Sequence, residues 1–126
     1  MGSCLSTENH SAELRNLSNS DRGLWAEDTV LDFLIQKKWS VISKRKKYKF
    51  GEIDLIVERN QQVAIIEIKF LHNPWMAFER LHHKQLMKLI TNFNYLKKIE
   101  FRKMDVKLFL CFVSKNKEII WINLQE

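Results

Sequence analysis

The sequence has few of the residues that interrupt or cross-link a chain: its 126 residues include one proline, three glycines and two cysteines. So little proline and glycine leaves no room for a low-complexity linker. The length fits one domain, large enough to bury a core without the help of a disulfide or a metal. Cys4 and Cys111 show no pairing pattern, which favours a reducing cytoplasm.

Long apolar runs are also missing. No stretch of about 18 consecutive apolar residues exists, and the N-terminus has no signal-peptide core. We therefore expect no membrane partner. The apolar fraction of 45% and the charged fraction of 29% are those of an ordinary globular protein.

Basic charge is abundant. Lys and Arg number 21 against 15 Asp and Glu, which gives a net charge of +6 and a pI near 9.4. Such a balance suits a polyanionic partner, because cationic patches attract nucleic acid through its phosphates. An acidic membrane or an acidic protein would suit the same charge.

The expected elements are two helices and five strands. Residues 1–20 are rich in Ser, Asn and Glu, and we expect a flexible N-terminal tail there, followed by one domain over 21–126. Apolar periodicity and turn residues predict helices at about 22–37, capped by Asp21, and from Pro74 to about 98, with strands at 39–50, 52–58, 63–70, 106–114 and 119–124. The order α-β-β-β-α-β-β places a crossover helix between the third and fourth strands. It predicts an α/β single domain with a mixed sheet of about five strands and flanking helices.

The residues that could perform chemistry lie in one strand-turn-strand unit over residues 51–69. Asp54 lies in its first strand, and Glu67 and Lys69 lie in its second. Strand side chains alternate between faces, so Glu67 and Lys69 point the same way, and Asp54 can join them if the strands pair as a hairpin. Two carboxylates and an ammonium on one patch can bind a divalent metal and attack a phosphate ester.

Two further groups can complete such a metal site. The main-chain carbonyl of Ile68 lies between Glu67 and Lys69. Glu27 interrupts the apolar stripe of the first helix, where a carboxylate is costly unless it has a partner such as a metal or a lysine. Structural alternatives stay open: an exposed Glu67–Lys69 ion pair, a solvated Asp54 and a Glu27 that extends its carboxylate to water.

These residues carry a specific resemblance. A helix Glu, a strand Asp and a Glu-x-Lys on the next strand resemble the PD-(D/E)XK nuclease superfamily. Within that superfamily, the chain resembles the uncharacterised YraN-like (UPF0102) family of endonuclease-type proteins. The matching residues are Gly23 and Glu27, the run Gly-Glu-Ile-Asp-Leu-Ile over 51–56, Ile-Glu-Ile-Lys over 66–69, and Arg102 to Val106 with Ile-Trp-Ile-Asn over 120–123. That family is related in fold to archaeal Holliday junction resolvases. The resemblance covers about residues 22–124.

The resemblance implies a restriction-endonuclease-like core in which Asp54, Glu67 and Lys69 carry catalysis and Glu27 supports it. It also places Lys84 and Gln85 where many superfamily members keep an auxiliary Lys or Gln. The chain departs from the family where Phe70-Leu71 replace the usual Thr-Arg pair after the Glu-x-Lys, a change that bears on substrate handling more than on metal binding.

The densest charge run is Lys44, Arg45, Lys46, Lys47 and Lys49, interrupted by Tyr48. Because it directly precedes the Asp54 strand, we interpret it as a contact along a phosphate backbone that leads to the site. A nuclear localisation signal or a solvated edge strand protected by lysines has the same composition.

The sequence thus predicts a cytoplasmic endonuclease that uses Mg²⁺ or Mn²⁺ to hydrolyse DNA, including branched or damaged DNA. RNA stays open as a substrate, and so does a homodimer. The alternatives are a non-cleaving nucleic-acid-binding module with the same fold and a basic interaction protein in which the acidic residues are incidental.

Overall fold

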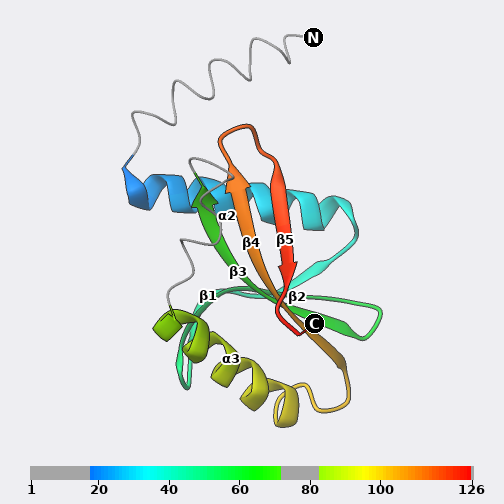
Figure 1. Cartoon of the computed structure of the whole chain (residues 1–126). Coiled ribbons are helices and arrows are strands. Elements are labelled where there is room, and N and C mark those ends of the chain that lie inside the picture. Colours follow the sequence, from blue (N-terminus) through cyan, green and yellow to red (C-terminus); the bar gives the residue numbers. More distant parts are fainter. Residues whose placement is uncertain (1–17, 72–82, 126) are drawn as a thin grey trace.

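The computed structural model describes residues 18–71 and 83–125. Within these residues the elements follow the predicted order (Figure 1). They are α2 (Asn19–Gln36), β1 (Ser40–Tyr48), β2 (Gly51–Arg59), β3 (Gln62–Leu71), α3 (His83–Lys98), β4 (Asp105–Ser114) and β5 (Ile119–Asn123). Most of the predicted N-terminal tail and the predicted helix start at Pro74 lie outside the described residues.

The strands form one mixed sheet, as predicted, and their order within the sheet is β1-β2-β3-β4-β5. β3 and β4 pair in parallel, and the other neighbours pair antiparallel. A parallel pair needs a crossover connection, and α3 lies in the connection between β3 and β4. Asn60 and Gln61, in the turn between β2 and β3, both have positive φ angles, 50° and 64°. This backbone is typical of the tight hairpin turns that match the twist of paired strands.

The predicted cap of the first helix was wrong. α2 begins at Asn19, and its N-cap is Ser18 rather than Asp21. The Ser18 hydroxyl oxygen accepts a hydrogen bond from the backbone N–H of Asp21 at 3.1 Å and donates one to the Asp21 carboxylate at 2.9 Å. Asp21 therefore lies in the first turn, where its negative charge interacts favourably with the helix dipole.

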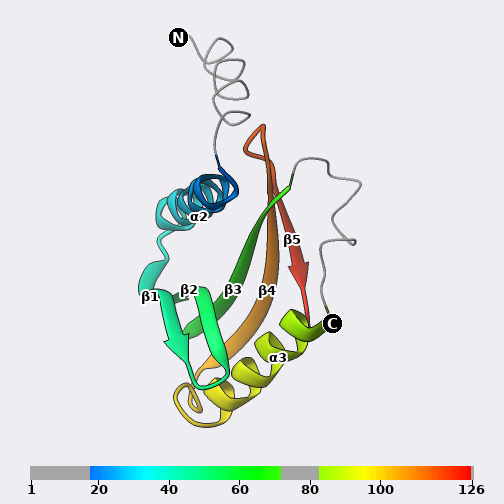
Figure 2. The same ribbon diagram turned by 90° about the vertical axis from the view of Figure 1, so that its left-hand side faces the viewer.

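The two helices cover opposite faces of the sheet (Figure 2). Ala26, Val30 and Leu34 of α2 pack on one face, and Leu89, Phe93 and Leu96 of α3 pack on the other. β3 contributes alternate residues to each core: Ala64, Ile66, Ile68 and Phe70 face α2, whereas Val63 and Ile65 face α3. Among the described residues, neither helix is both long and apolar enough to cross a bilayer.

The sheet forks between β2 and β3. Their ladder ends at the pair Leu55–Ile66, although β2 continues to pair with β1 as far as Gly51, and β3 with β4 as far as Leu71. Both views show the β1–β2 hairpin turning away from the end of β3 (Figures 1 and 2). Asp54 and Glu67 are the first residues beyond the last pair, so both lie where the fork opens.

Each arm of the fork is anchored to a different helix. At the hairpin tip, the side chain of Asn92 on α3 accepts a hydrogen bond from the Phe50 N–H at 2.9 Å and donates one to the Gly51 carbonyl at 3.2 Å. At the end of β3, the Phe70 ring packs edge-on against Trp25 of α2, with 5.8 Å between centroids. Phe70 is thus a packing residue that ties β3 to α2.

Candidate active site at the fork of the sheet

Asp54 bridges the two arms at the point where the ladder stops. Its carboxylate oxygen Oδ2 accepts a hydrogen bond from the backbone N–H of Ile68 at 2.8 Å. The Asp54 side chain thereby accepts the hydrogen bond of a β3 backbone N–H that has no backbone partner on β2 beyond the end of the ladder. The bond fixes the Asp54 carboxylate beside β3, as expected for two strands that pair as a hairpin.

Glu67 and Lys69 lie on one face of β3, as strand alternation requires. The Lys69 Nζ lies 3.5 Å from Glu67 Oε2, and the two side chains are only 23% and 21% exposed. Lys69 Nζ also donates a hydrogen bond to Gln85 Oε1 of α3 at 3.3 Å. The pair is therefore largely buried and held from a second element, unlike an exposed pair on a strand surface.

Glu67 is the most perturbed carboxyl group of the site. Its second oxygen, Oε1, is buried and has no hydrogen-bond partner. Burial, followed by repulsion from the Asp54 carboxylate, raises the pKa of Glu67 to about 8, and the Lys69 ammonium offsets part of that rise. A buried acceptor without a donor is costly in a folded protein, and such groups often mark a functional site.

Glu27 approaches the same region from α2. Arg45 Nε of β1 lies 3.7 Å from its carboxylate. Burial and the nearby Asp54 charge raise the pKa of Glu27, and Arg45 opposes the rise. Within the described ranges, no three or more His, Cys, Asp or Glu side chains are placed together to hold a metal ion. Glu27 is thus paired with Arg45, and the carboxylates brought together are Asp54 and Glu67.

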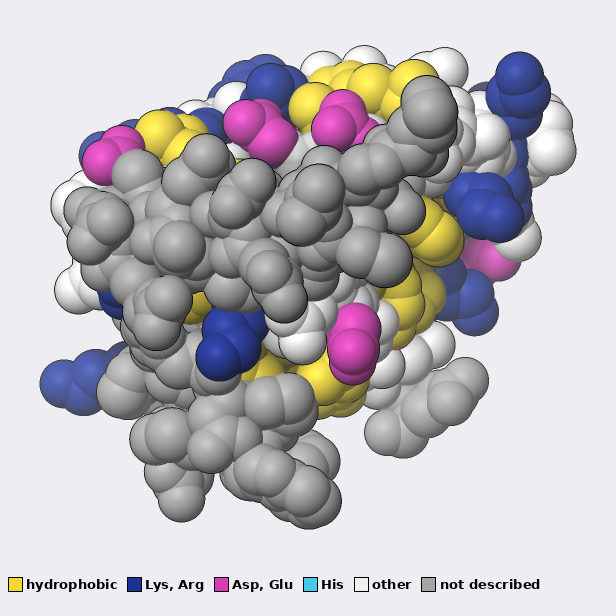
Figure 3. Space-filling view, turned by 90° about the horizontal axis from the view of Figure 1, so that it is seen from above, with side chains coloured by type: hydrophobic (Ala, Val, Ile, Leu, Met, Phe, Trp, Pro, Cys, Tyr) yellow, Lys and Arg dark blue, Asp and Glu magenta, His cyan; other side chains and the backbone are white. Residues whose placement is uncertain are grey.

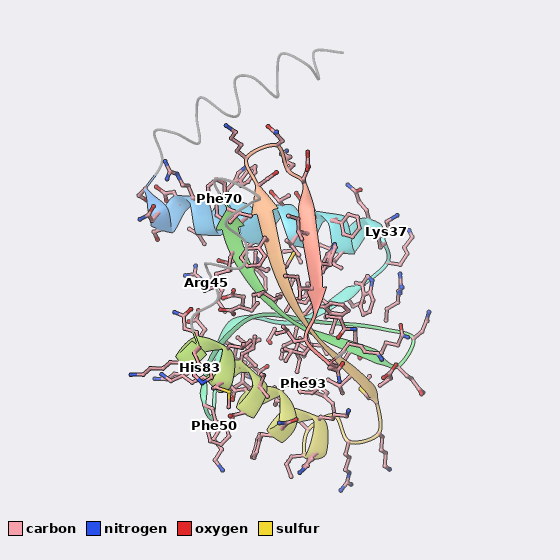
Figure 4. All side chains as sticks on the ribbon, viewed as in Figure 1. Lys37, Arg45, Phe50, Phe70, His83 and Phe93 are labelled. Atoms are coloured by element: carbon pink, nitrogen blue, oxygen red, sulfur yellow. The ribbon has the colours of Figure 1, made fainter. Side chains whose placement is uncertain are left out.

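The predicted phosphate-contact run lies on β1, at the edge of the sheet, except for Lys49 just beyond its end, and its cationic side chains are exposed. Several of them also contact neighbours: Arg45 pairs with Glu27, the Lys46 Nζ lies 5.3 Å from the centre of the Tyr48 ring, and Lys49 lies over two rings near the hairpin tip. Figure 4 shows Arg45 and Phe50 along this hairpin. Lys84 is an exposed residue in the first turn of α3.

A pocket of about 240 Å³ adjoins Glu67 and was not predicted from the sequence. Its lining includes Phe50 and Glu52 from the hairpin and Gln85, Lys88 and Leu89 from α3. Asn92 also lines it and is 1% exposed. A signal for Asn92 was present in the sequence, because it interrupts the apolar stripe formed by Leu89, Phe93 and Leu96.

The sequence matches the profile described as "Uncharacterised protein family UPF0102" over residues 26–109, a stretch that contains Glu27, Asp54, Glu67 and Lys69. A UPF0102 protein of Fusobacterium nucleatum is 29% identical over 100 residues, covering 76% of this chain and 82% of the relative. A UPF0102 protein of Campylobacter jejuni subsp. doylei is 37% identical over 79 residues.

The Campylobacter match spans 63% of this chain and 65% of its relative, slightly less than two thirds of that protein. A third relative, a UPF0102 protein of Prochlorococcus marinus, is 36% identical over 53 residues, which are 42% of each chain. The family profile spans well over half of the sequence. The chain belongs to the uncharacterised protein family UPF0102.

Proposed function

We propose that this protein is a divalent-metal-dependent endonuclease that hydrolyses phosphodiester bonds in DNA. The observation that carries the proposal is the buried, unpartnered Oε1 of Glu67 beside Asp54 and Lys69. Burial makes the ionised form of Glu67 costly, and a cation that binds there would offset that cost. The matched family is uncharacterised, so membership in it names no activity.

The donor set fits Mg²⁺ or Mn²⁺. Both ions prefer oxygen ligands, and Mg²⁺ keeps several waters, so two carboxylates with one carbonyl can suffice. Asp54 and Glu67 would hold the ion, with the Ile68 carbonyl as the third protein ligand. When bound, the ion supplies a Lewis acid for the phosphate and lowers the pKa of water.

The side chains have separate roles in the proposed reaction. Glu67 must release its proton before it can act as a ligand, and its raised pKa makes this step depend on pH near neutrality. Lys69, oriented by Glu67 and Gln85, presents its ammonium to the negative charge that develops on the phosphate. The Ile68 N–H keeps the Asp54 carboxylate in position.

Glu27 and Arg45 support the site from the other side of the fork. Arg45 offsets the repulsion between Glu27 and Asp54. The exposed lysines of β1 would contact the phosphate backbone beside the site. These contacts are independent of base sequence, so the proposed substrate is recognised by charge and shape.

The test is cleavage of a labelled panel of four-way junction, flap, duplex and single-stranded DNA, with Mg²⁺, Mn²⁺ or EDTA. We expect metal-dependent cutting by the parent, and loss of at least about 100-fold in Glu67→Gln and Asp54→Asn, the scale seen when a single catalytic electrostatic group is removed. Glu58→Gln removes an exposed carboxylate of β2 and should cut like the parent. Cutting by Glu67→Gln at the parent rate would refute the site.

A second measurement separates metal binding from activity. Mn²⁺ should raise the melting temperature of the parent and of Glu58→Gln, because a ligand that binds only the folded state stabilises it by about 2.7 kcal/mol at 100 times its Kd. Glu67→Gln should show little rise. Tight DNA binding without any cutting would favour the binding module instead, and no effect of metal or DNA would favour the basic interaction protein.

A further inference from the structure

The pocket beside Glu67 is formed by the arm of the fork that is tied to α3. The hairpin contributes Phe50 and Glu52, and α3 contributes Gln85, Lys88 and Leu89. Its volume of about 240 Å³ lies below the range of about 300–1,000 Å³ that is usual for sites of drug-sized ligands. The pocket therefore suits one small group rather than a length of chain.

The residues that line the pocket include acidic, basic, amide and apolar side chains, and this mixture limits which chemical group can bind there. Glu52 and Glu67 bring carboxylates into the pocket, which disfavour a second phosphate. The same carboxylates accept hydrogen bonds, Lys88 donates them, and the Gln85 amide can do both. Phe50 and Leu89 supply apolar surface. A flat, neutral group whose edge has both donors and acceptors is complementary to these walls.

The pocket rim is held in place by α3. Asn92, which is almost fully buried, binds both the Phe50 N–H and the Gly51 carbonyl. The Phe50 ring is 38% exposed, and it packs edge-on against Tyr95 with 6.1 Å between centroids. Lys49 Nζ lies 5.5 Å from the Phe50 centroid and 4.9 Å from that of Tyr95. An aromatic ring with fixed backbone and a cation beside it is a suitable surface for base stacking.

We propose that this pocket accepts one unpaired nucleobase of the nucleic acid, next to the phosphate that a metal ion at Asp54 and Glu67 would hold. Because Glu67 lines the pocket and also belongs to the carboxylate pair, the base and the phosphate would belong to neighbouring positions of one strand. A paired base cannot leave its stack without cost, and an unpaired one can at little cost. The inference rests on the proposed function and adds a substrate class to it: DNA with an unpaired nucleotide.

Binding without cleavage tests this proposal. Dissociation constants are measured in EDTA for a duplex with one bulged nucleotide and for the same duplex in which that nucleotide is abasic. For the parent, loss of the base should weaken binding about tenfold, within the range found for removal of one stacked base. Phe50→Ala should bind the two duplexes within about twofold of each other, and Phe50→Tyr, which keeps a ring, should behave like the parent.

Phe33→Ala is the matched control, since Phe33 is also 38% exposed but lies on α2, where it packs against Trp121. It should show the full tenfold preference. Melting temperatures of all variants verify that each is folded. Equal loss on base removal in the parent and in Phe50→Ala would overturn the pocket assignment, as would no loss in the parent.

The outcomes distinguish the inference from the proposed function. Metal-dependent cutting of DNA with no dependence on Phe50 or on the bulged base overturns the pocket but leaves the endonuclease. A Phe50-dependent preference for the base, with no cutting on any substrate, supports the pocket and moves the function to a binding module.

Discussion

At the scale of single residues, Glu67 is the side chain of the site whose burial is most costly to the folded protein. It lies on a strand whose neighbouring positions are almost all buried, and it is the described side chain with a buried oxygen left without a partner. A buried carboxylate is stable mainly in its neutral form, and the nearby Asp54 strengthens that preference. The folded protein without metal should therefore hold a proton at Glu67 that the unfolded chain releases.

This gives a prediction about stability and pH. The Glu67 carboxyl group titrates near 4.5 in the unfolded chain and near 8 in the folded one. Between these values the folded state binds more protons, so raising the pH lowers the free energy of unfolding, by up to about 1.4 kcal/mol per pH unit. Glu67→Gln keeps a neutral side chain. Its melting temperature relative to the parent should rise from pH 5 to pH 8.5 in EDTA.

Glu58→Gln serves as the control, since its exposed carboxylate should give the same difference from the parent at both pH values. A constant difference for Glu67→Gln as well would contradict the raised pKa.

Single residues also show where sequence reasoning succeeds. Asp54, Glu67 and Lys69 were predicted to converge because strand alternation and hairpin pairing are nearly fixed rules. The pairing of Glu27 with Arg45 was not predicted, because it depends on how α2 packs on the sheet. Arg45 also has a positive φ of 49°, which the sequence does not predict, because arginine rarely adopts this conformation and the surrounding pattern is that of a strand.

At the scale of elements, the fork explains the site better than any strand alone. The sequence predicts the strands and their order, since apolar runs and turn residues are local signals. It does not predict that the β2–β3 ladder ends at Leu55–Ile66, because that depends on contacts between distant segments. Those contacts are the packing of Phe70 on Trp25 and the bonds from Asn92 to the hairpin tip. These contacts hold the hairpin tip against α3 and the end of β3 against α2, on opposite faces of the sheet.

Asn92 should therefore be essential to the hairpin arm. Asn92→Ala leaves the Phe50 N–H and the Gly51 carbonyl without their partners, at a cost of about 1–3 kcal/mol. Urea titration should show this loss, and the pocket preference for a base should weaken with it. Asn94→Ala, an exposed position of the same helix, should change the free energy of unfolding by less than about 0.5 kcal/mol. Equal stability of the two variants would show that the tip is not held by Asn92.

At the scale of the whole molecule, the question is how a net charge of +6 is distributed. The face seen from above carries both Lys or Arg and Asp or Glu side chains among apolar ones, so that face is not uniformly basic (Figure 3). β1, by contrast, carries five cations between residues 44 and 49, counting Lys49 just beyond its end, and it forms an edge of the sheet next to the Asp54 strand. Charge on this edge is what a phosphate backbone leading to the fork would meet first.

If β1 contacts DNA, its lysines set the salt dependence of binding. Each phosphate contact contributes about 0.9 to the slope of log K against log salt concentration, so Lys44→Gln with Lys47→Gln should reduce the slope by about 1–2. Affinity should fall by a similar factor for every DNA in the panel, because phosphate contacts carry no sequence information. The same two changes at Lys115 and Lys117, in the β4–β5 turn, preserve the change in net charge and should leave the slope nearly unaltered. If the slope falls equally in both double variants, the overall charge attracts the DNA. If the slope is unchanged in the β1 variant, β1 is a solvated edge strand whose lysines protect it from aggregation.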